Sequence, residues 1–197
     1  ILWNFETSRS PAEPRASWTL RHSSPPGEDR KGTTMADIQL VRVDFRLIHG
    51  QIVTKWFGAT RSNEILVVDD ELSQDEFMAS IYEMSAPKGA KVRVLSVADA
   101  VKDWQDNQLG GGKLLVLFKS VPQLHAAWKA GFPLPEVQIG GLGSAPERKV
   151  VYGPITLDAP DAAMLREIAA AGIRVYLHQV PEDPSAELEP VLQKAGF

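Results

Sequence analysis

The chain has 197 residues, of which 44% are hydrophobic, 21 are Lys or Arg and 25 are Asp or Glu, giving a formal net charge of -4 at pH 7. This length suits a single domain with one core, and the mild acidity argues against nucleic acid or an anionic membrane surface as a partner. Cysteine is absent, which excludes disulfides and thiolate chemistry, and no apolar run approaches the ~18 residues of a membrane span.

Residues 1–34 differ in composition from the rest of the chain. Four prolines lie among Ser, Arg and Glu, and no apolar periodicity persists. This composition predicts a disordered N-terminal extension. Because the chain begins at Ile1 while Met35 directly precedes the first strand pattern, we expect Met35 to be the native start and the extension to be non-native. A genuine flexible arm is the alternative. In either case the folded domain is expected to cover 35–197.

From Met35 onward, short runs rich in Val, Ile and Leu alternate with segments that have apolar residues at helical spacing. The runs predict strands at 38–43, 65–68, 92–95, 114–118, 137–139, 150–152 and 175–177. The intervening patterns predict helices at 51–57, 74–84, 97–104, 123–129 and 162–171. Ser73 and Glu76 have the spacing of a capping box for the second helix.

This alternation predicts the fold class. Apolar strands joined by helical crossovers indicate a single α/β domain, an open, mostly parallel β-sheet with helices on both faces. In such folds ligands and reacting groups gather at the carboxyl ends of the strands. The loops that follow the strands are therefore the places to look for function.

The loop after the first strand contains a candidate phosphoacceptor, His49, followed by Gly50 and Gln51. A neutral imidazole can accept a phosphoryl group on a ring nitrogen. Phosphoryl transfer needs positioning and positive charge, which Arg46 and the N–H groups of Gly50 and Gln51 could supply. Gly50 would also let the backbone approach the phosphate, and Asp44 could orient Arg46 or the second imidazole nitrogen.

On spacing alone, a single loop histidine is more often a hydrogen-bonded structural residue than a catalyst. The segment Asp44-x-Arg46-Leu47-Ile48-His49-Gly50-Gln51, however, closely resembles the active-site signature of the mannose/fructose/sorbose family of phosphotransferase system enzyme IIB. The resemblance continues more weakly through 68–71, 86–89, 117–119, 139–141, 172–175 and 179–181, and covers essentially all of 35–197. Many members carry Asp or Glu where Phe45 stands and Asn where Gln138 stands.

The resemblance implies a protein-N(pi)-phosphohistidine–sugar phosphotransferase, the IIB component. His49 would receive a phosphoryl group on its pros nitrogen from a phosphohistidine of enzyme IIA. It would pass that group to a sugar hydroxyl held by membrane subunits IIC and IID. The resemblance also implies a cytoplasmic location, peripheral association with those subunits and a homo-oligomer. Sugar recognition would reside in the membrane subunits, so mannose, fructose, sorbose and amino sugars are all compatible.

Two alternatives belong to other functional classes. A regulatory phosphoprotein would accept phosphate at His49 without delivering it to a sugar. A non-catalytic module would only bind an anion through Arg46 and His49. Phosphohistidine exchange needs no protein-bound metal, because the incoming group is already activated, so we expect neither metal nor cofactor.

Other motifs are assigned structural roles. The segment 141–146 nearly matches a dinucleotide fingerprint, but Pro146 replaces its third glycine and no helical pattern follows. Asp69 and Asp70 are predicted to be helix-entry carboxylates. Lys119 could touch a phosphate or be a solvated charge. His125 and His178 are expected to be packed or surface residues and not ligands. Of the adjacent aromatic residues Trp56 and Phe57, one is expected in the core and the other at the surface.

Overall fold

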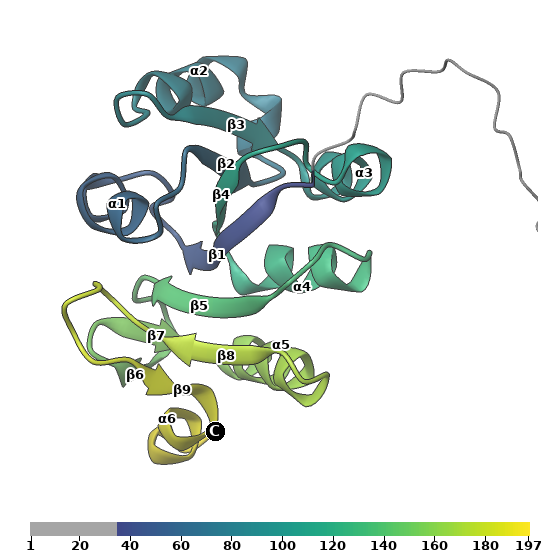
Figure 1. Ribbon diagram of the computed structural model, residues 1–197. Helices are drawn as coiled ribbons and strands as arrows, with labels where there is room; N and C mark the ends of the chain where they lie inside the picture. Colours follow the sequence, from purple (N-terminus) through teal and green to yellow (C-terminus); the bar gives the residue numbers. More distant parts are fainter. Residues whose placement is uncertain (1–34) are drawn as a thin grey trace, which may run out of the picture. The chain divides into compact units, whose positions relative to one another are not determined.

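A seven-stranded sheet organises the computed structural model, which describes residues 35–197 (Figure 1). Its strands stand in the order β3-β2-β4-β1-β5-β8-β9. They are β1 (Asp37–Asp44), β2 (Glu64–Val68), β3 (Lys91–Leu95), β4 (Lys113–Phe118), β5 (Glu136–Gly141), β8 (Arg174–Leu177) and β9 (Ala186–Glu187). All neighbours are parallel except β9, which pairs antiparallel with β8. The predicted fold class is confirmed, whereas the predicted extension, 1–34, lies outside the described residues.

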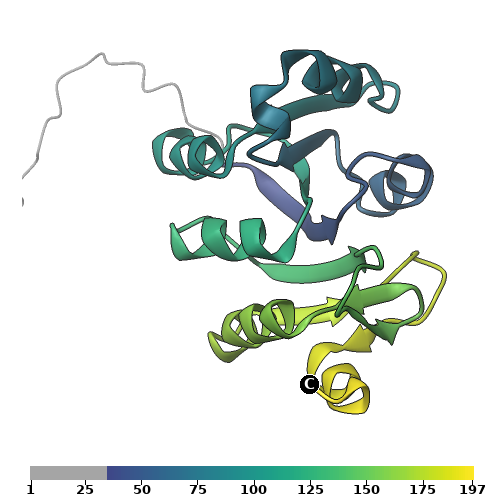
Figure 2. The same ribbon diagram turned by 180° about the vertical axis from the view of Figure 1, so that it is seen from behind.

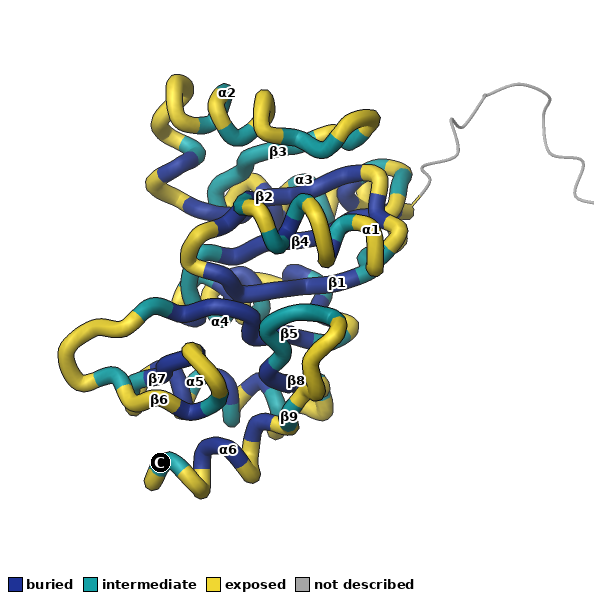
Figure 3. The backbone as a smooth tube through the Cα atoms, turned by 90° about the vertical axis from the view of Figure 1, so that its left-hand side faces the viewer, coloured by how far each residue is buried: buried dark blue, intermediate teal, exposed yellow. Residues whose placement is uncertain are grey.

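Helical segments cover both faces of the sheet, and α1 lies opposite α3, α4 and α5 in Figures 1 and 2. They are η1 (Ile52–Trp56), α1 (Phe57–Ala59), η2 (Leu72–Gln74), α2 (Glu76–Met84), α3 (Val97–Asn107), α4 (Val121–Lys129), α5 (Ala159–Ala170) and α6 (Leu188–Ala195). Two buried clusters form the core. The larger joins the sheet to α3, α4, α5 and α6, and the smaller joins it to η1. The central strands are consequently buried along most of their length (Figure 3).

Polar residues at the helix entrances explain where several helices begin. Ser96, Ser120 and Asp158 accept a hydrogen bond from the third backbone N–H of α3, α4 and α5. The predicted capping box of α2 is wrong, because Asp75 is the cap and accepts from the Met78 N–H at 2.9 Å. Ser73 lies inside the η2 turn and donates its hydroxyl to Asp70 instead.

The C-terminal third differs from the sequence prediction. The predicted strand at 150–152 exists as β6 (Lys149–Tyr152), but it pairs antiparallel with β7 (Ile155–Leu157) in a separate two-stranded sheet. Gly153, at φ +50°, occupies the turn between them. β7, β9 and α6 have no counterpart in the prediction. Among the described helices, none has the length and apolar character needed to cross a membrane.

Candidate functional site

The loop after β1 is held on both sides. β1 lies between β4 and β5, and the Phe45 N–H donates to the Gly141 carbonyl at 2.9 Å. The Leu47 N–H donates to the Asp44 carbonyl at 2.9 Å, which closes a tight turn. Leu47, with φ +52°, and Ile48 bury their side chains beside the smaller core cluster. The loop is therefore anchored by its apolar residues, and its polar residues face one another above β1.

Three residues predicted from the sequence converge at this end of β1. The buried Asp44 carboxylate accepts from the Arg46 backbone N–H at 3.3 Å and lies 3.4 Å from the Arg46 Nε through the same Oδ1. Its other oxygen, Oδ2, lies 3.9 Å from His49 Nε2. Asp44 therefore stands between a half-exposed guanidinium and a mostly buried imidazole.

The His49 ring has two different nitrogen environments. Nδ1, the pros nitrogen, is 2.9 Å from the Leu47 carbonyl oxygen. A carbonyl only accepts, so Nδ1 carries a proton in this arrangement and donates it. Nε2 is buried and has no hydrogen-bond partner within residues 35–197. In a neutral ring, Nε2 would consequently hold the lone pair.

Gly50 and Gln51 stand at the start of the helical segment that follows His49. Gln51 Oε1 accepts from Arg46 Nη2 at 3.3 Å, so this side chain helps to place the guanidinium. A Cβ at Gly50 would meet nothing within 4 Å, which leaves open space beside the loop. The segment then adopts a π-helical turn, η1, a geometry often found at functional sites.

Arg42, which the sequence analysis missed, lies under the site and is fully buried. Its Nη2 donates to Asp44 Oδ2 at 3.0 Å, and its Nη1 donates to the His178 carbonyl at 2.8 Å and to Gln138. The guanidinium also lies 5.0 Å from the Trp56 ring centroid. Burial lowers the pKa of Arg42, and the Asp44 carboxylate opposes that effect. The two buried charges thus neutralise each other.

Two glycines of β5 make room for this pair. A Cβ on Gly140 would stand 1.7 Å from the Arg42 guanidinium carbon, and a Cβ on Gly141 would stand 2.9 Å from Asp44 Oδ1. Real Cβ atoms do not approach other atoms so closely. The glycine pair is therefore required by packing against Arg42 and Asp44, a reason that the sequence alone did not reveal.

A chain of hydrogen bonds continues from Arg42 toward the other end of the sheet. Gln138 Nε2 donates to the Tyr176 hydroxyl at 3.2 Å, and that hydroxyl donates to Glu136 at 2.9 Å. Burial, aided by the hydrogen bond to Glu136, raises the pKa of Tyr176 to about 12. Gln138 thus has a definite structural role, because its amide joins Arg42 to Tyr176.

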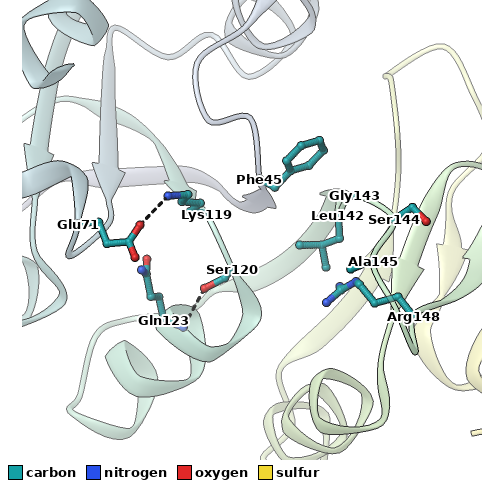
Figure 4. A pocket seen from close by; sticks show the side chains of 10 residues that line it. All are labelled: Phe45, Glu71, Lys119, Ser120, Gln123, Leu142, Gly143, Ser144, Ala145 and Arg148. Carbon is teal, nitrogen blue, oxygen red and sulfur yellow. Dashed lines mark hydrogen bonds and ion pairs between the residues drawn. The ribbon is translucent and has the colours of Figure 1, made fainter.

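A cleft of about 470 Å³ opens beside the loop (Figure 4). Its lining includes Phe45, Lys119 and Arg148, which come from three different strand ends. Lys119 pairs with Glu71 at 3.1 Å, and that hydrogen bond raises the pKa of Lys119. Arg148 pairs with Asp158 and Asp161, so both cations already have acidic partners.

The remaining predicted residues take structural positions. Asp69 accepts from the Leu72 N–H and Asp70 from the Val97 N–H, each at 2.7 Å, which confirms them as helix-entry carboxylates. The two histidines are placed as predicted, since His125 pairs with Glu167 and His178 packs edge-on against Trp56. The predicted division of Trp56 and Phe57 between core and surface holds only in part, because Trp56 is buried while Phe57 is half-buried and packs against the smaller core cluster. The segment after Gly141 forms no helix before the β6–β7 hairpin. Across residues 35–197, no cluster of His, Asp and Glu could hold a metal ion.

Comparisons with known proteins agree on one family. A model of the "PTS system sorbose subfamily IIB component" matches residues 38–197. The sorbose-specific EIIB component of Lacticaseibacillus casei is 31% identical over 151 residues, 77% of this chain and 92% of that protein. The fructose-specific EIIB component of Bacillus subtilis is 28% identical over 159 residues, 81% of this chain and 98% of that protein.

Solved structures give the same result. The crystal structure of manxB from Thermoanaerobacter tengcongensis superposes with a TM-score of 0.77 at 34% identity, covering 83% of this chain and 99% of that one. The IIBSor domain of the sorbose permease from Klebsiella pneumoniae superposes with a TM-score of 0.76 at 28% identity, covering 82% and 99%.

Proposed function

The chain belongs to the sorbose-subfamily IIB components of the phosphotransferase system, and from this premise we propose that His49 is the residue that carries the phosphoryl group. IIB components of this class transfer phosphoryl groups during sugar uptake. The observation that carries the proposal is the convergence of Asp44, Arg46 and His49 at the carboxyl end of β1. A nucleophile, a cation and an orienting carboxylate then share one loop.

In the first step, a ring nitrogen of His49 attacks the phosphorus of a phosphohistidine on enzyme IIA. A phosphorus–nitrogen bond forms on His49 as the donor's bond breaks, and the donor imidazole leaves with the bonding electrons. If Nδ1 is the nucleophile, the ring must leave the Leu47 carbonyl and shift its proton to Nε2. Asp44 Oδ2, 3.9 Å away, is positioned to accept a hydrogen bond from that proton after a small movement.

In the second step, a sugar hydroxyl oxygen attacks the same phosphorus. A phosphorus–oxygen bond forms as the phosphorus–nitrogen bond to His49 breaks. The His49 imidazole departs as a neutral ring, because its other nitrogen is protonated. The hydroxyl proton passes to solvent or to the nitrogen that has just been released. Neither step requires a metal ion, because the phosphohistidine is already an activated donor. The open space beside Gly50 leaves room for the phosphoryl group near the backbone.

Arg46 is proposed to stabilise the transferring phosphoryl group. We expect Arg46→Ala to slow phosphorylation of His49 by about 100-fold, because one positive charge is lost at the developing negative charge. Arg46→Lys should restore part of the rate, since lysine keeps the charge but not the planar fork. Stopped-time assays of transfer from phosphorylated enzyme IIA would measure these rates.

Lys119 offers a matched control for Arg46. Both side chains are 41% exposed and both follow a strand end of the same sheet. Because the Lys119 ammonium is paired with Glu71 and has no contact with Asp44 or His49, Lys119→Ala is expected to change the rate by less than about threefold. Equal losses in the two variants would contradict a specific role for Arg46.

The proposed relay needs two kinds of partner. Phosphotransferase IIB components work with enzyme IIA and with membrane subunits IIC and IID. We propose that this chain acts in the cytoplasm, takes its phosphoryl group from a cognate enzyme IIA and meets the membrane subunits peripherally. The sugar is proposed to be bound by those subunits.

Reconstitution of both half-reactions tests the relay. The purified protein is incubated with phosphoenolpyruvate, the general phosphotransfer proteins and a cognate enzyme IIA, and its intact mass is measured. We expect one acid-labile phosphate, which then appears on a sugar when membranes containing IIC and IID are added. A labelled protein that never phosphorylates a sugar would indicate a regulatory phosphoprotein. An unlabelled protein beside phosphorylated enzyme IIA would overturn the proposal.

A further inference from the structure

Helix α2 exposes a stripe of large apolar side chains. Phe77, Ile81 and Met84 are 73%, 38% and 76% exposed, and their spacing of four and three residues places them on one face of the helix. None of the nine residues of α2 is buried, and Figure 3 shows the helix in exposed and intermediate colours throughout. Clustered exposed apolar residues mark interaction surfaces more often than single ones do. We call these three residues the α2 stripe.

A second cleft links α2 to the phosphoacceptor loop. This cleft of about 250 Å³ is lined by Met78 and Tyr82 of α2 on one side and by Phe45 and Leu47 of the loop on the other. Leu47 also supplies the carbonyl that holds His49 Nδ1. A partner seated across this cleft would therefore contact both α2 and the loop that carries His49. This position suits a protein that exchanges a phosphoryl group with His49.

The surroundings of the α2 stripe are acidic. Residues 70–88 contain five Asp or Glu residues against one basic residue, Lys88, and all five acidic residues are exposed: Asp70, Glu71, Asp75, Glu76 and Glu83. Some have local partners, since Asp75 caps α2 and Glu71 pairs with Lys119. Glu76 and Glu83 flank the stripe directly along the helix. An apolar centre with an acidic rim is complementary to an apolar surface with a basic rim.

Resting on the proposed function, we propose that the α2 stripe docks on the basic cytoplasmic face of the membrane subunits that hold the sugar. Cytoplasmic loops of membrane proteins carry an excess of Lys and Arg, which matches the acidic rim. The same rim would be repelled by anionic lipid, so the surface suits a membrane protein rather than the bilayer itself. Docking here would bring the His49 loop against the partner that receives the phosphoryl group.

Binding to membranes tests this assignment. The variants are Phe77→Ser/Met84→Ser, which removes the most exposed apolar side chains, and Glu76→Lys/Glu83→Lys, which reverses the rim charge. Val150→Ser is the matched control, because Val150 is a 67% exposed apolar residue on the separate β6–β7 hairpin. Each full-length protein is sedimented with inverted vesicles that contain the cognate IIC and IID subunits, and separately with protein-free anionic liposomes.

We expect both α2 variants to bind the IIC/IID vesicles at least about tenfold more weakly than wild type, while the Val150→Ser control binds normally. Phosphorylation by enzyme IIA should stay within about twofold of wild type in all of them. Added salt should weaken wild-type binding and affect Glu76→Lys/Glu83→Lys less. Thermal unfolding should be nearly unchanged, because the replaced side chains are exposed.

Four results would overturn the assignment. Unchanged binding of both α2 variants would show that the surface is not used. A selective loss of phosphorylation by enzyme IIA would assign the stripe to the donor. Dissociation of an oligomer in the variants would assign it to a second copy of the chain. Equal binding to protein-free liposomes would assign it to lipid. Failure of the proposed function would look different, because wild type itself would then remain unphosphorylated or pass no phosphate to sugar.

Discussion

Replacing Arg42 by methionine is expected to lower the free energy of unfolding by about 3–5 kcal/mol, a large share of the stability of a domain this size. The variant would leave the fully buried Asp44 carboxylate without its 3.0 Å partner. It would also leave the His178 carbonyl and Gln138 without the donor that now satisfies them. Equilibrium unfolding in urea, followed by circular dichroism, would measure the loss.

Arg46→Met is the control, because it removes a second guanidinium that contacts the same carboxylate. Arg46 is exposed to solvent and its contact with Asp44 is longer, 3.4 Å, so the expected cost is below about 1 kcal/mol. The double variant Arg42→Met/Asp44→Asn should recover part of the stability lost by Arg42→Met alone, since no unpaired buried charge remains. A cost of less than about 1 kcal/mol for Arg42→Met would contradict a structural role for the pair.

The position of the loop that carries His49 could be predicted from sequence because local and global signals agreed. A Val-rich strand followed by a polar loop and a helical pattern places residues 44–51 at the carboxyl end of a parallel strand. The structure puts Asp44, Arg46 and His49 there within one loop. The short sequence separation of these residues made their proximity nearly independent of the rest of the fold.

Arg42 shows where the sequence reasoning fell short. In a strand that reads Leu-Val-Arg-Val-Asp, alternation suggests that Arg42 and Asp44 face solvent. In a central parallel strand both faces are covered, so two charges on the same face must pair with each other. Recognising that β1 lies between β4 and β5 requires the strand order, which a single sequence does not contain. The partners from β5 and β8 depend on the same long-range topology.

Short elements at the C-terminal end were missed for a different reason. β7 and β9 have three and two residues, too few for any periodicity to emerge. Helix α6 carried usable signals, namely Leu188, Val191 and Leu192 at helical spacing and Gly196 as a left-handed stop. Pro190 near the start of α6 obscured these signals, although proline is tolerated in the first turn of a helix.

The hydrogen bond from His49 Nδ1 to the Leu47 carbonyl had no signal in the sequence at all, because it depends on the backbone conformation of Leu47.

Replacing His49 by alanine is expected to abolish phosphorylation by enzyme IIA, because the variant lacks the nucleophilic nitrogen. Its neighbours cannot substitute, since Asp44 is buried and bound to two arginines. Intact mass after incubation with phosphorylated enzyme IIA should show no added phosphate. Nuclear magnetic resonance of the labelled wild-type ring should place the phosphate on Nδ1, with the proton on Nε2.

His125 and His178 provide matched controls in the same assay, because they are the other histidines within residues 35–197. His125→Ala removes a ring that pairs with Glu167, so it should be phosphorylated at the wild-type rate. His178→Ala removes a ring packed on Trp56, and it should keep full phosphorylation while unfolding at a somewhat lower temperature. A phosphate retained in folded His49→Ala, or lost in either control, would show that another residue carries the group. The proposed chemistry would then have to be reassigned, because the contacts of Asp44 and Arg46 have a catalytic meaning only if the reacting nitrogen belongs to His49.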